Sequence, residues 1–330
     1  MRLANLELTI VVVGISLREA YEGQMLTAYP ACFPLVTREW ADGTLVVLRN
    51  TVVAKVCESA EQTAERTWPM QAARFKGWLA VATQCQSDMV VKRLLLDGRE
   101  CPVVQRTDMG QVSPTMAELG EELMPTHPLV TCTTVVNRTH LALLDRLLVV
   151  TPRPRRRRLA QLKWYSLACD QAAPFARLIA QWICFNLQYR DVKKKDRQAF
   201  KDYLRKRLPR RAARWIQADR AGQLRELSQA ILVLQGAKKS TTLVSAQLSG
   251  LLAGPRANAR EVISSGVDCV YSVRNDLFHG NRTFDEPADW ALLQHADRLM
   301  SLVNGYLLCE AAGVCEQLPG LEQQVPPLRR

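Results

Sequence analysis

The segment Tyr271-Ser272-Val273-Arg274-Asn275-Asp276-Leu277-Phe278-His279-Gly280 holds an arginine, an asparagine directly after it, and a histidine five positions beyond the arginine. Arginine can grip a phosphate through several N–H donors, and histidine can move a proton near neutral pH. Together they are sufficient for cutting RNA without a metal ion. The apolar spacing predicts one long helix from Ala257 that ends at Gly280, because glycine favours the position after the last helical residue.

Helical patterns flank this segment on both sides. We expect helices over residues 161–173 and 175–189, which are rich in helix formers and are bent or separated by Pro174. Residues 224–235 have apolar positions at the helical period, and residues 288–310 continue the pattern after the motif. The second half of the chain is therefore predicted to be all-α.

Two motifs in this half resemble one known family. Residues 271–280 resemble the Arg-polar-x-x-x-His signature of the HEPN superfamily, in the "VRNxLFHG" form common among its bacterial members. Upstream, Trp182-x-x-Phe185-Asn186-x-x-Tyr189 is similar to a helix found in the same bacterial group. The resemblance covers residues 159–312, about half of the chain.

The resemblance implies a bundle of four to six helices that usually forms a homodimer, with the motif helices of the two subunits facing each other. Active members of the family are metal-independent endoribonucleases. By this resemblance His279 would act as general acid or base, Arg274 would hold the scissile phosphate, and Asn275 would orient the phosphate or the histidine ring. Supporting positions on the two motif helices would be Asn186, Tyr189 and Tyr271.

Helix geometry bears on how this motif could work. Residues five apart are separated by about 140° around an α-helix, so Arg274 and His279 do not lie on one line. Either the helix end is distorted at Gly280, or a second copy of the chain supplies the complementary group. Both alternatives agree with a composite site in a dimer. A third interpretation is structural, since cations are favoured near a helix C-terminus.

The formal net charge is +12, and most of the excess lies between residues 190 and 214. Such a charge indicates an anionic partner, and we expect RNA. A run of charged residues is often only the solvated face of a helix. The apolar side of this segment consists of Phe200, Tyr203 and Leu204, which is too narrow for a helix that binds a membrane. The predicted RNA-binding residues are Lys193, Lys194, Lys195, Arg197, Arg205, Arg207, Arg210 and Arg211.

The first half contains both strand-like and helix-like patterns, which predict an α+β accessory domain over residues 1–150. We expect this domain to have a sensing or regulatory role. A strand is expected over residues 8–15, and Asp42-Gly43 and Asp97-Gly98 are turn signals between strands. Ser59 is expected to cap a helix to Ala82 that Pro69 interrupts. Residues 139–149 fit a helix or a strand equally well.

The domain boundaries follow from composition. Prolines and four consecutive arginines mark residues 151–158 as a linker. It could serve as a solvated hinge or as an arm that contacts phosphates, and the sequence does not distinguish the two. The helical bundle is expected over residues 159–312, and residues 313–330 form a C-terminal tail.

Composition excludes several classes of protein. The ten cysteines contain no CxxC pair, so we expect neither a zinc site nor a disulfide framework, and no cofactor. No segment approaches the length of a membrane span, and the protein is expected to be cytoplasmic. Residues 236–241 lack the glycine and lysine spacing of a phosphate-binding loop, which argues against ATP hydrolysis.

Three functions remain in competition at this level. The first is a metal-independent endoribonuclease that serves as a toxin or anti-phage effector, with an antitoxin or defence-system protein as a possible partner. The second is a catalytically silent HEPN module that binds RNA or a partner protein. The third is a structural protein that uses the bundle only for dimerisation.

Overall fold

The computed structural model describes residues 2–13, 15–17, 21–22, 36–40, 43–84, 87–103, 134–150, 155–171, 173–189, 196–219, 221–233, 239–254, 257–279 and 287–314. These residues fall into two compact units, Met1–Ser166 and Leu167–Arg330. The first unit combines a sheet with helices, and the described part of the second contains helices alone. The coarse prediction of an α+β half followed by an all-helical half is therefore confirmed.

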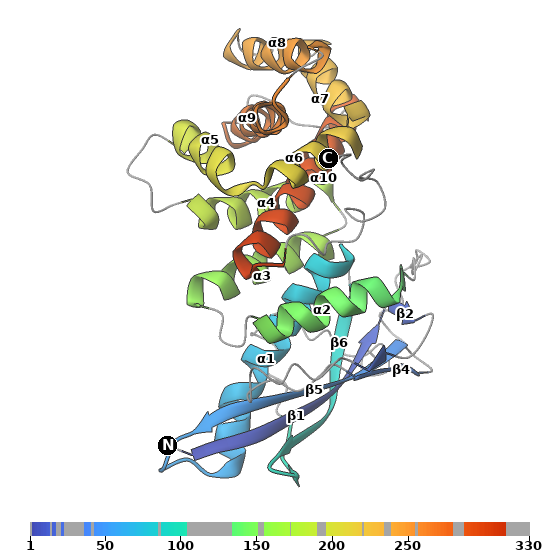
Figure 1. The fold of residues 1–330 in the computed structure, drawn as a ribbon, viewed down its shortest axis with the longest axis vertical. Helices are drawn as coiled ribbons and strands as arrows, with labels where there is room; N and C mark the ends of the chain where they lie inside the picture. The colour runs from blue at the N-terminus through green and yellow to red at the C-terminus, as the bar shows by residue number, and fades with distance from the viewer. Residues whose placement is uncertain are drawn as a thin grey trace, which may run out of the picture. The chain divides into compact units, whose positions relative to one another are not determined.

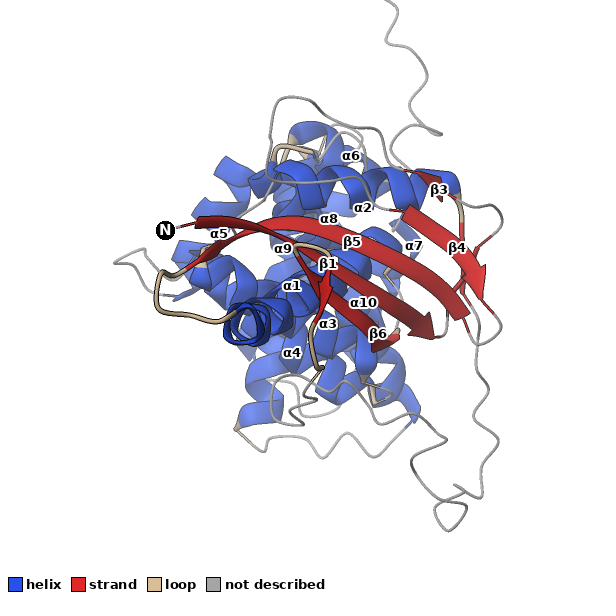
Figure 2. Cartoon of the chain, turned by 90° about the horizontal axis from the view of Figure 1, so that it is seen from below, coloured by secondary structure: helices blue, strands red, loops and turns tan. Residues whose placement is uncertain are grey.

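The first unit is built on a six-stranded sheet with the order β3-β4-β5-β1-β6-β7. The strands are β1 (Arg2–Val13), β3 (Tyr21–Glu22), β4 (Val36–Trp40), β5 (Gly43–Ala54), β6 (Asp88–Leu96) and β7 (Arg99–Glu100). All neighbouring pairs in it are antiparallel. A separate parallel pair joins β2 (Ile15–Leu17) to β8 (Thr134–Val136). Figure 2 shows β1 in the middle of the large sheet, between β5 and β6.

One face of this sheet is covered by helix α1 (Ala60–Thr83). Alternate side chains of β1, among them Leu6 and Leu8, are buried, as expected for a strand with one covered face. Asn50 on β5 lies opposite Leu6, and its amide donates to the Gln71 side chain of α1 at 2.9 Å. The helix therefore packs on the face that carries Leu6 and Leu8.

Both predicted hairpins are present. Leu96 pairs with Arg99, and the two residues between them have positive φ angles, 50° at Asp97 and 78° at Gly98. Positive φ at both central residues is what a two-residue hairpin turn of the favoured twist requires. In the second hairpin Trp40 pairs with Gly43, so β4 and β5 are also joined by two residues.

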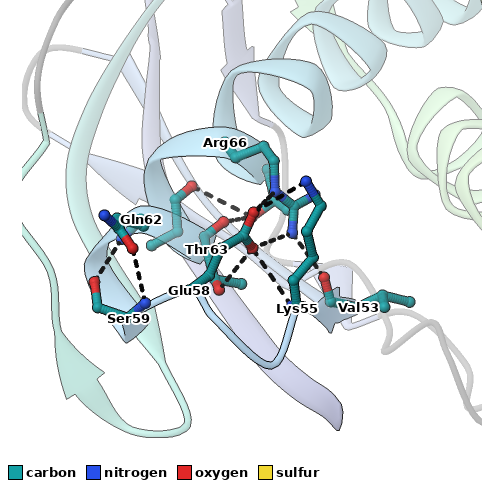
Figure 3. Close-up of polar contacts among 9 residues, drawn as sticks. Val53, Lys55, Glu58, Ser59, Gln62, Thr63 and Arg66 are labelled. Atoms are coloured by element: carbon teal, nitrogen blue, oxygen red, sulfur yellow. Dashed lines mark hydrogen bonds and ion pairs between the residues drawn. The ribbon is translucent and has the colours of Figure 1, made fainter. Parts of the chain in front are cut away.

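The start of α1 is held by a dense polar network, which Figure 3 draws. Ser59 forms the predicted cap, and it exchanges hydrogen bonds with Gln62 in a capping box. Two nitrogens of Arg66 donate to the Glu58 carboxylate at 2.7 and 2.9 Å. These bonds lower the pKa of Glu58 to about 2, with a smaller contribution from Lys55.

The expectation that Pro69 interrupts this helix is wrong. Helix α1 continues without a break from Ala60 to Thr83 with the proline inside it. A proline removes one backbone hydrogen bond, but Trp68, Phe75 and Trp78 are all buried on either side of it. Burial of large apolar side chains outweighs the lost bond.

The predicted linker is a helix over part of its length. Helix α3 runs from Arg156 to Asp170, while residues 151–154 lie outside the described residues. Arginine is a good helix former, so repulsion among these side chains does not prevent the helix. The boundary between the two units falls inside α3, after Ser166 rather than in the predicted linker. Helix α2 (Arg138–Val150) settles the ambiguous segment before it as helical.

The second unit is a bundle of seven described helices after α3. They are α4 (Pro174–Tyr189), α5 (Asp196–Arg207), α6 (Arg210–Asp219), α7 (Ala221–Val233), α8 (Lys239–Ala253), α9 (Ala259–Phe278) and α10 (Pro287–Ala312). Helix α9 contacts α5, α6, α7, α8 and α10, and Figure 1 shows it between α5 and α8. Every residue from 262 to 270 is buried, so the motif helix forms the centre of the bundle.

Helices α4 and α10 are joined by a buried polar contact. The amide of Asn304 donates to the backbone oxygen of Gln181 at 2.8 Å and to its side-chain oxygen at 2.7 Å. The Asn304 oxygen in turn accepts from Gln188 at 3.0 Å. This side chain is fully buried, so its hydrogen bonds fix the register of the two helices.

Candidate functional site

The two motif helices contact each other through aromatic rings. Trp182 on α4 and Tyr271 on α9 lie with their ring centroids 5.6 Å apart. Phe200 on α5 lies 6.0 Å from Trp182 and 5.6 Å from Tyr271, so it closes a three-helix cluster. Edge-to-face and tilted pairs at this spacing add to the free energy of burial. Two segments that are far apart in sequence thus meet in one core.

The end of α9 is a regular helix as far as it is described. The backbone N–H of His279 donates to the carbonyl of Asn275 at 3.0 Å, which is the ordinary α-helical bond. His279 occupies the C-cap position with φ −93° and ψ 5°, and its side chain is exposed. No distortion separates Arg274 from His279, so the angle of about 140° between them remains. Gly280 lies outside the described residues.

The Arg274 guanidinium is held by its own helix. One of its terminal nitrogens donates to the Asn275 side chain at 2.8 Å, and its central carbon lies 4.3 Å from the centre of the Phe278 ring. Within the described residues Arg274 has no carboxylate partner, and its buried Nε has no hydrogen-bond acceptor. A positioned, unneutralised guanidinium of this kind is suited to a phosphate.

Phe278 lies at the surface, although an apolar residue in a helical pattern is usually buried. Its side chain is 54% exposed, and it is the last residue of α9. An exposed aromatic ring next to a histidine can stack on a nucleic-acid base. Only its position at a helix end, four residues after an arginine, could have signalled this in the sequence.

Of the supporting residues of α4, Tyr189 interacts electrostatically with Arg274. The Tyr189 hydroxyl also donates to the Asn186 side chain at 2.5 Å. Burial raises the pKa of Tyr189, Asp196 and Tyr271 raise it further, and the charge of Arg274 opposes the shift. A tyrosine with a raised pKa stays protonated at neutral pH and positions its neighbours rather than exchanging a proton.

No family model, curated protein or solved structure matches this chain. The assignment of a function therefore depends on the two motifs and on the geometry that joins them.

Arg197, one of the predicted RNA-binding residues, has a different role in the structure. Two of its nitrogens donate to the carboxylate of Asp268 on α9, at 2.5 and 2.9 Å. The ammonium of Lys201 lies 2.5 Å from the same carboxylate, which is 1% exposed. A buried carboxylate needs such partners, so Arg197 and Lys201 secure α5 to α9. The sequence offered no signal for this ion pair, because its members are 71 residues apart.

The other predicted basic residues divide into two groups. Lys193, Lys194 and Lys195 lie outside the described residues. The second group, which we call the basic corner, lies where α5 ends and α6 begins. It contains the predicted residues Arg205, Arg207, Arg210 and Arg211, together with Lys206 and Arg214, which were not among the predicted residues. All six are exposed. Within the described residues none of the six forms an ion pair, so their charge is available to an anionic partner.

The other two histidines within the described residues have structural contacts. His140 and Asn137 exchange hydrogen bonds at the start of α2, and burial lowers the pKa of His140. His295 lies 3.3 Å from the Glu226 carboxylate. Among the described histidines, His279 of the motif is therefore the one that lies exposed at the end of a helix.

The described residues give little support for other kinds of site. They contain no group of three or more acidic, cysteine or histidine side chains arranged to hold a metal ion. The six described cysteines, Cys57, Cys101, Cys169, Cys184, Cys269 and Cys309, are free thiols. Burial raises the pKa of Cys269 to about 12, so it is not a nucleophile. Among the described helices none is long and apolar enough to cross a membrane.

Proposed function

We propose that this protein is a metal-independent endoribonuclease of the HEPN type. One observation carries the proposal: the end of α9 presents an exposed histidine and, five residues earlier, an arginine that is held in place without a neutralising carboxylate among the described residues. The ring contact between Trp182 and Tyr271 supports it further, because it brings together the two helices that resemble the family motifs.

The chemistry follows from these side chains. A base removes the proton of a ribose 2′-hydroxyl, and the 2′-oxygen then attacks the adjacent phosphorus. Arg274 stabilises the negative charge that grows on the phosphate oxygens. The bond from phosphorus to the 5′-oxygen breaks as an acid protonates that oxygen. The products are a 2′,3′-cyclic phosphate and a 5′-hydroxyl end.

The regular helix favours a composite site between two copies. Because about 140° separates the two side chains on one helix, we propose that Arg274 of one subunit faces His279 of the partner subunit. In a two-fold dimer the same pairing occurs twice. The alternative of a distorted helix end receives no support from the hydrogen bonding of residues 275–279.

The decisive experiment incubates the purified protein with RNA in EDTA. We expect cleavage with cyclic phosphate ends, lowered roughly 10²- to 10⁴-fold by His279→Ala and roughly 10²- to 10³-fold by Arg274→Ala. Arg225→Ala is the matched control, because Arg225 is an exposed arginine of α7. Imidazole added to the His279→Ala variant should restore part of the rate. Undiminished cleavage by either motif variant would refute the proposed roles.

Mixing the two inactive variants tests the composite site. After subunit exchange half of the dimers are mixed, and each of these carries one complete centre out of two. We therefore expect about a quarter of the wild-type activity to return. A mixture that stays inactive although exchange is complete would argue for a site within one chain.

Binding of RNA without cleavage is the second candidate function. The observation that favours it is the basic corner, with six exposed cations free of ion pairs within the described residues. RNA binding that is salt-sensitive and indifferent to His279→Ala, with no cleavage products, would select this function.

The wider role that we propose is a toxin or anti-phage effector in the cytoplasm. The family resemblance supports the role, and free thiols are usual in that reducing compartment. The first unit would then sense a signal or recruit a partner such as an antitoxin. Expression from an inducible promoter should arrest growth, and the His279→Ala variant should not.

A further inference from the structure

Helix α5 lies antiparallel to α9, and three contacts fix their register. The ring of Phe200 lies 5.6 Å from Tyr271, and Lys201 contacts Asp268. Just beyond the end of α5, the backbone oxygen of Leu208 accepts from Arg260 at 2.6 Å. Later residues of α5 thus contact earlier residues of α9. The basic corner lies at the start of α9, and the candidate site lies at its end.

The distance between the two regions follows from helix geometry. Fourteen residues separate Arg260 from Arg274, and at a rise of ~1.5 Å per residue this places them about 21 Å apart along the helix. The cations between them, Arg197 and Lys201, are bound to Asp268. The free positive charge is therefore concentrated at the two ends rather than spread evenly along the helix pair.

Stability accounts for only part of the charges of the basic corner. Arg205, Lys206 and Arg207 lie in the last turn of α5, where the helix dipole favours cations. Arg210 and Arg211 occupy the first turn of α6, where the helix dipole disfavours cations. Six neighbouring cations also repel one another, and Glu261 in the first turn of α9 and Asp202 on α5 offset only part of this charge. Residues placed at a cost in free energy are candidates for function.

The partner of this corner is a polyanion in water rather than a lipid bilayer. A helix that binds a membrane surface must offer its apolar side to the acyl chains. In α5 and α6 that side is already used, because Leu204, Ala213 and Ile216 are buried in the bundle. The exposed side of both helices offers guanidinium and ammonium groups, which suit phosphates.

We propose that the basic corner is a second RNA-binding site, which holds the strand at a fixed distance from the bond that is cut. At ~3.4 Å per nucleotide of a stacked strand, 21 Å corresponds to about six nucleotides. The protein therefore selects RNA by length, because a shorter strand cannot reach both ends of α9. This inference rests on the proposed ribonuclease function.

Two oligonucleotides test the proposal. One has four nucleotides and the other twelve, and in each all but one of the 2′-hydroxyls are methylated, so that only one bond can be cut. The test variant is Arg207→Glu with Arg211→Glu. The control is Lys92→Glu with Arg225→Glu, which makes the same change of charge at exposed positions on β6 and α7. Cleavage is measured as kcat/KM, and binding by fluorescence anisotropy.

We expect the wild type and the control to cleave the longer strand at least about tenfold more efficiently than the shorter one. In the test variant this ratio should fall to about one, because the longer strand loses its contacts with the basic corner. The slope of log affinity against log salt should also become shallower by about 1.4, since each neutralised phosphate contributes about 0.7 for a single strand.

Three results would overturn the inference. The first is that the wild type cleaves both strands with equal kcat/KM. The second is that the test variant keeps the wild-type ratio of kcat/KM between the two strands. The third is that the wild type binds anionic phosphatidylserine vesicles and the test variant loses this binding but still binds RNA. If the wild type cleaves neither strand, the proposed ribonuclease function is wrong. Fluorescence anisotropy then still tests whether the basic corner binds RNA. Weaker binding of the twelve-nucleotide strand by the test variant alone then supports it, and equal binding by all three proteins refutes it.

Discussion

The ion pair between Asp268 and its two cations offers a direct test of how α9 is held in the bundle. The Asp268 carboxylate is 1% exposed, whereas the side chains of Arg197 and Lys201 are 41% and 22% exposed. Removing the carboxylate by Asp268→Ala leaves both cations without their partner. Breaking a fully buried pair costs about 3–5 kcal/mol, and here both cations can turn partly to water. We therefore expect a loss of about 2–3 kcal/mol.

Urea unfolding followed by circular dichroism measures this loss. Hydrogen exchange of a peptide covering residues 262–270 locates it in α9, because these amides are in the buried part of the helix. Glu261→Ala is the matched control. It removes an exposed carboxylate from the first turn of the same helix and should cost about 0.5 kcal/mol. A loss below about 1 kcal/mol for Asp268→Ala, or one equal to that of the control, would refute the claim that this pair secures α5 to α9.

Two further predictions concern stability. Gly77→Ala should destabilise the protein by about 1–3 kcal/mol despite the better helix propensity of alanine, since the new Cβ would lie 2.5 Å from the Cβ of Leu162. The new Cβ of Gly250→Ala meets open space, so this variant should be more stable by up to about 1 kcal/mol. Thermal melts that shift both variants in the same direction would contradict this. Burial raises the pKa of Asp297 from 3.8 to about 6, so the folded state binds a proton more tightly than the unfolded state. The free energy of unfolding should therefore fall by about 3 kcal/mol as pH rises from about 3 to about 7. Unfolding curves at several pH values should show this fall in the wild type and a smaller one in Asp297→Asn.

Local features of the fold could be predicted from the sequence. The Asp97-Gly98 turn and the Ser59 cap depend on a few neighbouring residues, and the structure contains both. Pro69 shows the limit of such rules, because the burial of side chains around it comes from the tertiary structure. Over residues 156–158 the linker prediction was wrong for a related reason, since the propensity of arginine for helices outweighed the repulsion between its charges.

The candidate site could be predicted only in part. The residue types at 274, 275 and 279 indicated the chemistry, and the long helix that carries them is present. The bond of Arg197 to Asp268 could not be foreseen, because it joins residues 71 positions apart. Exposure of Phe278 also depends on where the helix ends within the bundle, and an apolar residue in a helical pattern gives no sign of that.

The contact between Gln181 and Asn304 has a consequence for biosynthesis. The two residues are 123 positions apart, and a ribosome that adds about 5–20 residues per second needs about 6–25 s to make the chain between them. For most of this interval α4 is complete and can pack on α5 through Trp182 and Phe200, but it lacks α9 and α10. The candidate site therefore cannot assemble on a nascent chain until nearly all of the described helices have been synthesised.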